Sequence, residues 1–163
     1  MRSLALLLSA LALMGAGANW RTFHARGITV RYPPGWFATA TRLTPVTAPP
    51  QIIAVASYRL PPDSGGANGC QPKAAIDRLP PTGAFIFGWE YGSDVFRPAF
   101  PPRPKHFSLK NYASYECMGL SYMLRFRQAG RFFQIHVVLG KRASTAQRAA
   151  VLRILDSFSA KPT

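Results

Sequence analysis

The sequence predicts an α+β fold: an antiparallel sheet of about five to seven strands with a C-terminal helix packed on one face. Three observations lead to this class. Short segments with alternating apolar side chains recur along the chain. Fourteen of the fifteen prolines lie between Pro33 and Pro104, which favours short strands joined by long loops there. The proline-free stretch 105–161 has room for longer elements and ends in a helical apolar repeat.

Size and composition narrow the class of protein. The 163 residues favour a single domain, because two domains would each have a core too small to fold well. Hydrophobic residues make up 48% of the chain, which excludes a disordered protein. The formal net charge of +14 sets 20 lysines and arginines against six aspartates and glutamates. With so few carboxylates, no calcium or magnesium site built from clustered acids is expected.

Four strands and a short helix are predicted before residue 118. Residues 28–32 alternate with period two and stop at a Pro-Pro-Gly turn, and residues 52–58 are rich in β-forming side chains. Residues 84–91 place four aromatic side chains on one face, and residues 107–117 form a weaker strand. A short helix is expected over residues 72–79, because a proline opens it and two prolines follow it.

The final third predicts a hairpin followed by the closing helix. Residues 122–126 and 132–139 alternate, and Gln128-Ala129-Gly130 between them forms the turn. The sequence Ser144-Thr145-Ala146-Gln147 has the S-x-x-Q form of a capping box, which predicts a helix start. Apolar side chains then recur at helical spacing: Ala150, Val151, Ile154, Leu155 and Phe158. We expect this helix to cover the aromatic face of strand 84–91.

Three of these segments carry a resemblance to a known family. The stretches ITVRYPPGW, FFQIHVVLG and ILDSF resemble the small exported domains of the PsbP-like family. The similarity covers roughly residues 27–36 and 121–158. It implies the fold shared by the photosystem extrinsic protein and Ran-binding Mog-type proteins, an α/β/α arrangement around an antiparallel sheet. It implies no function, because no residues here match the photosystem contacts or the Ran-binding surface.

Residues 1–18 have the features of a secretory signal peptide. Arg2 supplies the positive start, the run from Leu4 to Met14 is apolar, and Ala16-Gly17-Ala18 forms a small-residue cleavage site. Cleavage after Ala18 would leave residues 19–163 as one domain. The apolar run is short for a membrane span, which needs about 20 residues, and an uncleaved anchor is the alternative. We therefore expect a secreted or periplasmic protein with no transmembrane segment in the mature chain.

Cys70 and Cys117 are expected to form a disulfide, because exported domains mature under oxidising conditions. The bridge would close a loop of about 48 residues and contribute roughly 4 kcal/mol on the chain-entropy model. Metal ligation and free thiols are the alternatives. Neither a CxxC spacing nor a nearby histidine supports a zinc site.

No motif in the sequence marks a catalytic centre. Ser121 lies in Gly-Leu-Ser-Tyr-Met, which lacks the second glycine of a nucleophile elbow, and is expected to be a strand residue. His24, His106 and His136 show no metal-binding spacing. We expect His136 to be a surface or hydrogen-bonded structural residue and His24 to lie near a mobile N-terminus.

Glu90 and Asp94 are the one pair of acids close in sequence. Paired carboxylates can perform acid–base chemistry when folding brings them within several ångström of each other. The alternative is a solvated strand edge at which these acids pair with Arg97. The Gly-rich stretches fit no phosphate-binding loop, so no cofactor is expected.

The basic, proline-rich loop 96–110 is the segment most suited to binding. Its prolines keep it extended, and it contains no acid. Its fixed positive charges could meet phosphates or anionic surface polymers: Arg97, Arg103, Lys105 and Lys110. The alternative is compositional bias, since arginine outnumbers lysine 15 to 5 across the whole chain.

These observations predict an exported, non-enzymatic domain that binds or supports a component of the cell envelope. Its partner would be an envelope protein or an anionic polymer, and nucleic acid is not expected. Two alternatives stay open. One is an exported polyanion-binding protein that uses loop 96–110, and the other is an unrecognised hydrolase whose histidines and acids come together on folding.

Overall fold

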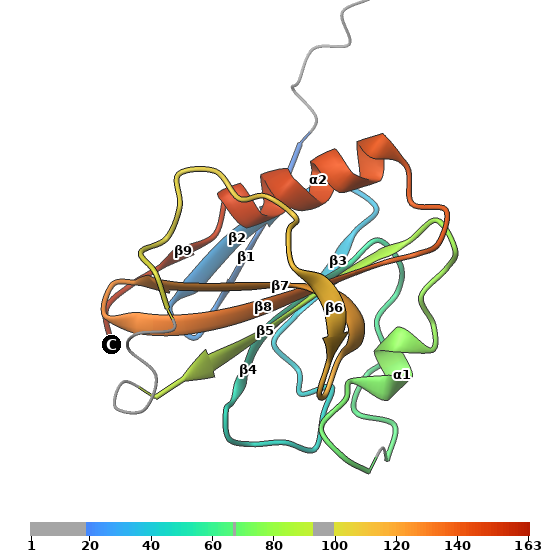
Figure 1. Cartoon of the computed structure of the whole chain (residues 1–163), viewed down its shortest axis with the longest axis horizontal. Helices are drawn as coiled ribbons and strands as arrows, with labels where there is room; N and C mark the ends of the chain where they lie inside the picture. The colour runs from blue at the N-terminus through green and yellow to red at the C-terminus, as the bar shows by residue number, and fades with distance from the viewer. Residues whose placement is uncertain (1–18, 67, 93–99) are drawn as a thin grey trace, which may run out of the picture.

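The computed structural model describes residues 19–66, 68–92 and 100–163. The predicted signal peptide (residues 1–18), Asp94 and Arg97 lie outside the described residues. Within the described ranges the fold is α+β, with two antiparallel sheets and two helices (Figure 1).

The smaller sheet has three strands in the order β1-β2-β9, and the larger has six in the order β3-β4-β5-β8-β7-β6. The strands are β1 (Arg21–Ala25), β2 (Ile28–Tyr32), β3 (Phe37–Thr39), β4 (Gln51–Ala56), β5 (Ala84–Tyr91), β6 (Tyr112–Tyr115), β7 (Gly119–Gln128), β8 (Arg131–Leu139) and β9 (Ser159–Ala160). The helices are α1 (Lys73–Ile76) and α2 (Thr145–Asp156).

The strongest sequence patterns are confirmed as elements. Strands β2, β4, β5, β7 and β8 and helix α2 lie where they were predicted. The β7–β8 hairpin turns through Ala129 and Gly130, whose positive φ angles of 54° and 76° fit a two-residue type I′ turn. At the start of α2, Ser144 Oγ accepts a hydrogen bond from the Gln147 backbone N–H at 3.1 Å, as the capping sequence predicts.

Other expectations are wrong in number or extent. The strands form two sheets instead of one, and β1, β3 and β9 were not predicted. The weak strand over 107–117 shrinks to β6, and the helix over 72–79 shrinks to the single turn α1. His24 lies in β1 instead of a mobile terminus, and its Nδ1 is hydrogen-bonded to Thr29 Oγ1 at 2.9 Å.

Helix α2 covers the face of the larger sheet opposite to the one we predicted. Its buried Val151, Ile154 and Leu155 pack into one cluster with Ile86 of β5 and Ile135 of β8. We call this side of the larger sheet the helix face. Figure 1 shows α2 lying over it, with β1, β2 and β9 beside the helix. The alternation of β5 was interpreted correctly, but its aliphatic side, not its aromatic side, receives the helix.

The aromatic face is the other side of the larger sheet, defined by Phe85, Phe87, Trp89 and Tyr91 of β5. Loops and the short helix α1 cover it: the loops contribute Leu43 and Met118 to a second buried cluster, and α1 contributes Ala75. In the described chain, the only helix in this layer is the single turn α1. The second helical layer that the resemblance implies is therefore replaced mostly by irregular loops.

Arg131 joins the two sheets and forms a buried ion pair with Glu90 inside the larger one. Arg131, at the start of β8, donates from Nε to Glu90 Oε1 at 2.7 Å and from Nη2 to Glu90 Oε2 at 2.6 Å. It also donates to the carbonyls of Arg26, in the β1–β2 turn, at 3.0 Å and of Lys161, after β9, at 3.2 Å. The hydrogen bonding of Arg131 to the Glu90 carboxylate is the main cause that raises the pKa of Arg131. Glu90 is therefore part of a structural clamp, not of the solvated edge expected from the sequence.

We predict that Arg131→Met lowers the free energy of unfolding by about 3 kcal/mol, because it leaves the carboxylate of Glu90 without its buried partner. Urea unfolding followed by circular dichroism measures this loss. Lys73→Met is the matched control, since it breaks the exposed Lys73–Asp77 pair and should cost about 0.5 kcal/mol or less. Equal losses in the two variants would contradict a clamping role for Arg131.

Candidate ligand pocket on the aromatic face

A cavity of about 250 Å³ opens on the aromatic face, between the sheet and the loops that cover it. Its floor is a row of side chains from three neighbouring strands. Trp89 of β5 is paired in register with Gln134 of β8, and Gln134 is paired with Arg125 of β7. Adjacent strands lie about 4.8 Å apart, so Trp89 and Arg125 flank Gln134 with roughly 10 Å between their backbones. All three side chains line the cavity.

The walls come from aromatic side chains and from the covering loops. Tyr91 of β5 and Tyr115 of β6 line the cavity, as do both residues of the Cys70–Cys117 disulfide. The predicted disulfide is thus confirmed, and it joins the loop before α1 to the turn between β6 and β7. Because this bridge forms part of the wall, the cavity has a covalently fixed side.

A chain of hydrogen bonds runs from the cavity into the core. Arg125 Nε donates to Gln134 Oε1 at 2.8 Å, which turns the Gln134 amide nitrogen toward His136 Nε2, 2.9 Å away. His136 Nε2 therefore accepts, and its proton lies on Nδ1, which donates to Ser121 Oγ at 3.0 Å. Ser121 Oγ in turn donates to the Gly119 carbonyl at 3.4 Å. Every hydrogen bond in the chain therefore has a fixed direction, from Arg125 inward to the Gly119 carbonyl.

His136 is fully buried and hydrogen-bonded, so of the two roles expected for it the structural one, not the surface one, is confirmed. Burial is the main cause that lowers its pKa to about 4, and the positive charge of Arg125 lowers it further. A protonated imidazole would also point a second N–H at the Gln134 amide group. The neutral ring is therefore the form that the core accommodates.

The Ser121–His136 pair is not arranged as a nucleophile with its general base. A general base must accept the serine proton, whereas His136 donates to Ser121 and its accepting nitrogen is taken by Gln134. Both side chains are also completely buried, where no substrate reaches them. Ser121 is a strand residue in β7, as predicted.

Arg125 and Glu116 are two charged residues that line the cavity. The ends of their side chains form no hydrogen bond or ion pair with the described chain. The terminal nitrogens of Arg125 make no hydrogen bond there, and its guanidinium lies over the Phe100 ring at 5.8 Å. Glu116, an exposed residue at the turn after β6, lines the same cavity without any ion pair. In addition, Nε1 of the buried Trp89 has no hydrogen-bond partner among the described residues. An unpaired buried donor costs about 1–3 kcal/mol.

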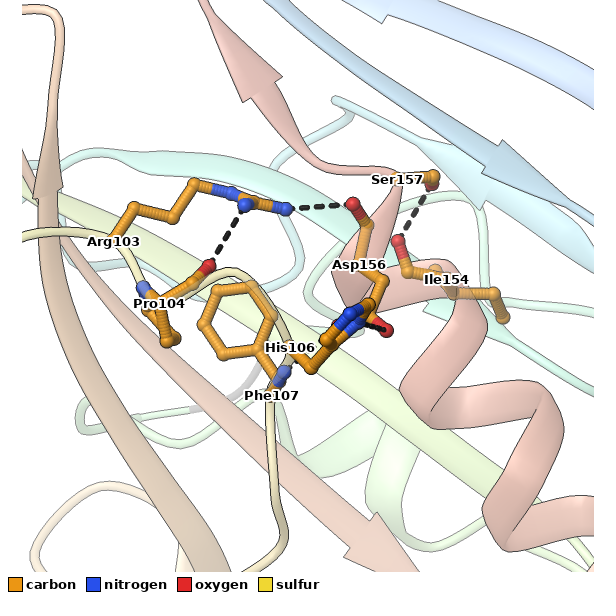
Figure 2. A network of polar contacts seen from close by, with 7 residues as sticks. All are labelled: Arg103, Pro104, His106, Phe107, Ile154, Asp156 and Ser157. Carbon is orange, nitrogen blue, oxygen red and sulfur yellow. Dashed lines mark hydrogen bonds and ion pairs between the residues drawn. The ribbon is translucent and has the colours of Figure 1, made fainter.

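The four basic residues predicted to bind anions do not share one environment. Arg97 lies outside the described residues, and Lys105 and Lys110 are exposed. Arg103 serves the fold: it donates to the carbonyl of Asp156 at 2.6 Å and to that of Pro104 at 2.8 Å. Figure 2 shows its guanidinium reaching the C-terminal end of α2. A cation at this end of a helix interacts favourably with the unpaired carbonyls and the helix dipole.

Loop residues around Arg103 are held at the same helix end. The Phe107 backbone N–H donates to Asp156 Oδ1 at 2.8 Å, and His106 Nδ1 lies 3.1 Å from Asp156 Oδ2 (Figure 2). The Phe107 ring is buried beneath the Arg103 guanidinium at 5.1 Å. Arg103, His106 and Phe107 thus dock the described part of the basic loop on the end of α2, while Lys105 and Lys110 are exposed.

No group of three or more histidine, cysteine, aspartate or glutamate side chains in the described parts of the chain lies close enough to hold a metal ion. Neither α1 nor α2 has the length and hydropathy that a membrane crossing requires.

The cavity was not anticipated from the sequence. Alternation in residues 84–91 did place Trp89 and Tyr91 on one face, which was a usable signal. Arg125 and Gln134 join them only through the strand order and register, which no local pattern reports.

Comparison of the chain with protein-family models, with curated proteins and with solved structures gives no match.

We predict that stability falls by about 3 kcal/mol between pH 7 and pH 4 through His136 alone. Its pKa is about 4 in the folded chain and ordinarily 6.5, so the unfolded chain binds the extra proton first as the pH falls. Urea unfolding at a series of pH values measures the slope. His136→Gln should flatten this part of the curve, while the control His106→Gln, at an exposed site, should keep it. An unchanged slope in His136→Gln would refute the assignment.

Proposed function

We propose that the chain is an exported, non-enzymatic binding domain of the cell envelope, and that it holds a small ligand in the cavity on the aromatic face. The observation that carries this proposal is the row Trp89–Gln134–Arg125. Together with Tyr91, Tyr115 and Met123 this row lines a cavity of about 250 Å³. The terminal nitrogens of Arg125 and the carboxylate of Glu116, which also lines it, have no partner within the described chain. Small-molecule sites have this character.

The reactive side chains nearest to the cavity are engaged in structural hydrogen bonds, which favours binding over hydrolysis. Ser121 and His136 are buried in a fixed donor–acceptor chain, and Glu90 is held by Arg131. These groups stabilise the fold, and none of them is left to transfer a proton to a substrate. The hydrolase alternative would need other residues, and none of the described side chains around the cavity forms a nucleophile–base pair.

The proposed export and the proposed family are each supported by observations other than the cavity. The signal-like residues 1–18 and the Cys70–Cys117 disulfide both fit an oxidising, extracytoplasmic compartment. An antiparallel sheet covered by a C-terminal helix is the arrangement that the resemblance to the PsbP-like family implies. On these grounds we assign the chain to the exported PsbP-like domains as part of the proposal.

The test is a nuclear magnetic resonance titration of the ¹⁵N-labelled protein with a protein-free small-molecule extract of a bacterial cell envelope. The three tryptophans give three indole signals, which Trp→Phe variants assign. We predict that the Trp89 indole and Arg125 Nε signals shift, while those of Trp20 and Trp36 stay in place. Val46→Phe, in the loop that lines the cavity, should abolish the shifts by filling the space. Absence of any Trp89 or Arg125 shift in the unmodified protein would reject the pocket as the binding site.

Polyanion binding by loop 96–110 is a second candidate, favoured by the exposure of Lys105 and Lys110. His106 and Lys110 also line a surface cavity of about 330 Å³ beside β7. Because Arg103 is engaged with α2, the two lysines are the described residues left to meet a polymer. Anionic polymers are attracted by such exposed charges over about a Debye length.

For this candidate we predict that a Lys105→Ser, Lys110→Ser double variant elutes from heparin at lower salt than the unmodified protein. The matched control is Lys141→Ser with Arg142→Ser, which removes two equally exposed charges from the turn before α2. A larger shift in the loop variant supports a loop site. Equal shifts in both double variants would mean that heparin responds only to net charge.

A further inference from the structure

We infer that the cavity on the aromatic face takes a zwitterion of amino-acid size, with its carboxylate on Arg125 and its ammonium group beside Glu116. This inference rests on the proposed function and specifies the ligand class for the same pocket.

Arg125 is positioned to receive a carboxylate. Its Nε donates to Gln134 Oε1 at 2.8 Å, and its guanidinium lies over Phe100, so the group is held from two sides. Its two terminal nitrogens have no partner in the described chain. These nitrogens are the end of the guanidinium that binds a carboxylate through two parallel hydrogen bonds. A side chain fixed in advance loses less conformational entropy on binding.

Glu116 supplies the opposite charge at the same cavity. Its carboxylate lines the space with Arg125, yet no ion pair forms between them within 4.0 Å. A simple anion would be attracted by Arg125 but repelled by Glu116. A simple cation would be attracted by Glu116 but repelled by Arg125. A ligand that carries both charges satisfies both groups, and like-charge repulsion then excludes single-charge competitors.

The remaining lining fits the body of such a ligand. Trp89, Tyr91, Tyr115 and Met123 line the same cavity as the two charges and present aromatic and thioether surface. The faces of these rings can also attract an ammonium group. At about 250 Å³ the cavity lies below the usual 300–1,000 Å³ of drug-sized sites, so it suits a single small molecule and not a polymer segment.

Two charge-deleted forms of each ligand test the inference. The probes are L-leucine and L-phenylalanine, their N-acetyl derivatives, which lack the ammonium group, and their amides, which lack the carboxylate. Dissociation constants come from the titration of the Trp89 indole signal. We expect a free amino acid to bind about tenfold or more tightly than either derivative, since each charge-assisted hydrogen bond contributes about 1.5–3 kcal/mol.

Variants assign each charge to its residue. Glu116→Gln should remove the discrimination against the N-acetyl form, and Arg125→Gln should remove the discrimination against the amide. Arg127→Gln is the matched control, because Arg127 is also exposed on β7 but does not line the cavity. Thermal unfolding checks that each variant is folded.

The outcomes separate this inference from the proposed function. If all three forms bind equally, or if only the cell-envelope extract shifts the Trp89 signal, the zwitterion is wrong and the pocket stands. If neither the probes nor the extract shifts that signal, both the zwitterion and the proposed function are wrong. Loss of binding in the Arg127→Gln control would also overturn the assignment, because it would show that general positive charge is sufficient.

Discussion

Burial of both faces of the two central strands is the constraint on which the rest of the structure depends. Nearly every residue of β5 and β8 is buried, because α2 with the smaller sheet covers one side and loops cover the other. Any polar group on these strands must then find a partner inside the protein. Glu90 and Arg131 pair with each other, and Gln134 and His136 bond within the chain that begins at Arg125. The structural clamp and the pocket floor are therefore two consequences of the same burial.

Much of the fold could be predicted because strong local patterns specify it. The alternation of residues 28–32, the Ala129-Gly130 turn and the Ser144 cap each act over a few residues, and the sequence displays them directly. Strands β1 and β9 escaped prediction because they have little apolar pattern and exist by pairing with β2. The face covered by α2 was misjudged since β5 is apolar on both sides. Periodicity alone does not say which side a helix will take.

The candidate site was less predictable, because it depends on register between distant segments. Trp89, Gln134 and Arg125 come from three strands, and pairing alone places them in one row. Loop 96–110 attracted attention through its charge, yet Arg103 in it stabilises the end of α2. Charge in a sequence shows where an interaction is available. It does not show whether the partner is another molecule or the protein's own backbone.

The position of the Cys70–Cys117 bridge has one more consequence. The bridge joins two covering loops and borders the cavity, while the hydrogen bonds of the larger sheet lie beneath it. Reduction would therefore release the cavity wall without removing a single strand pairing. The sheet and the wall of the cavity are in this way held by different bonds, and only the wall depends on the redox state of the surroundings.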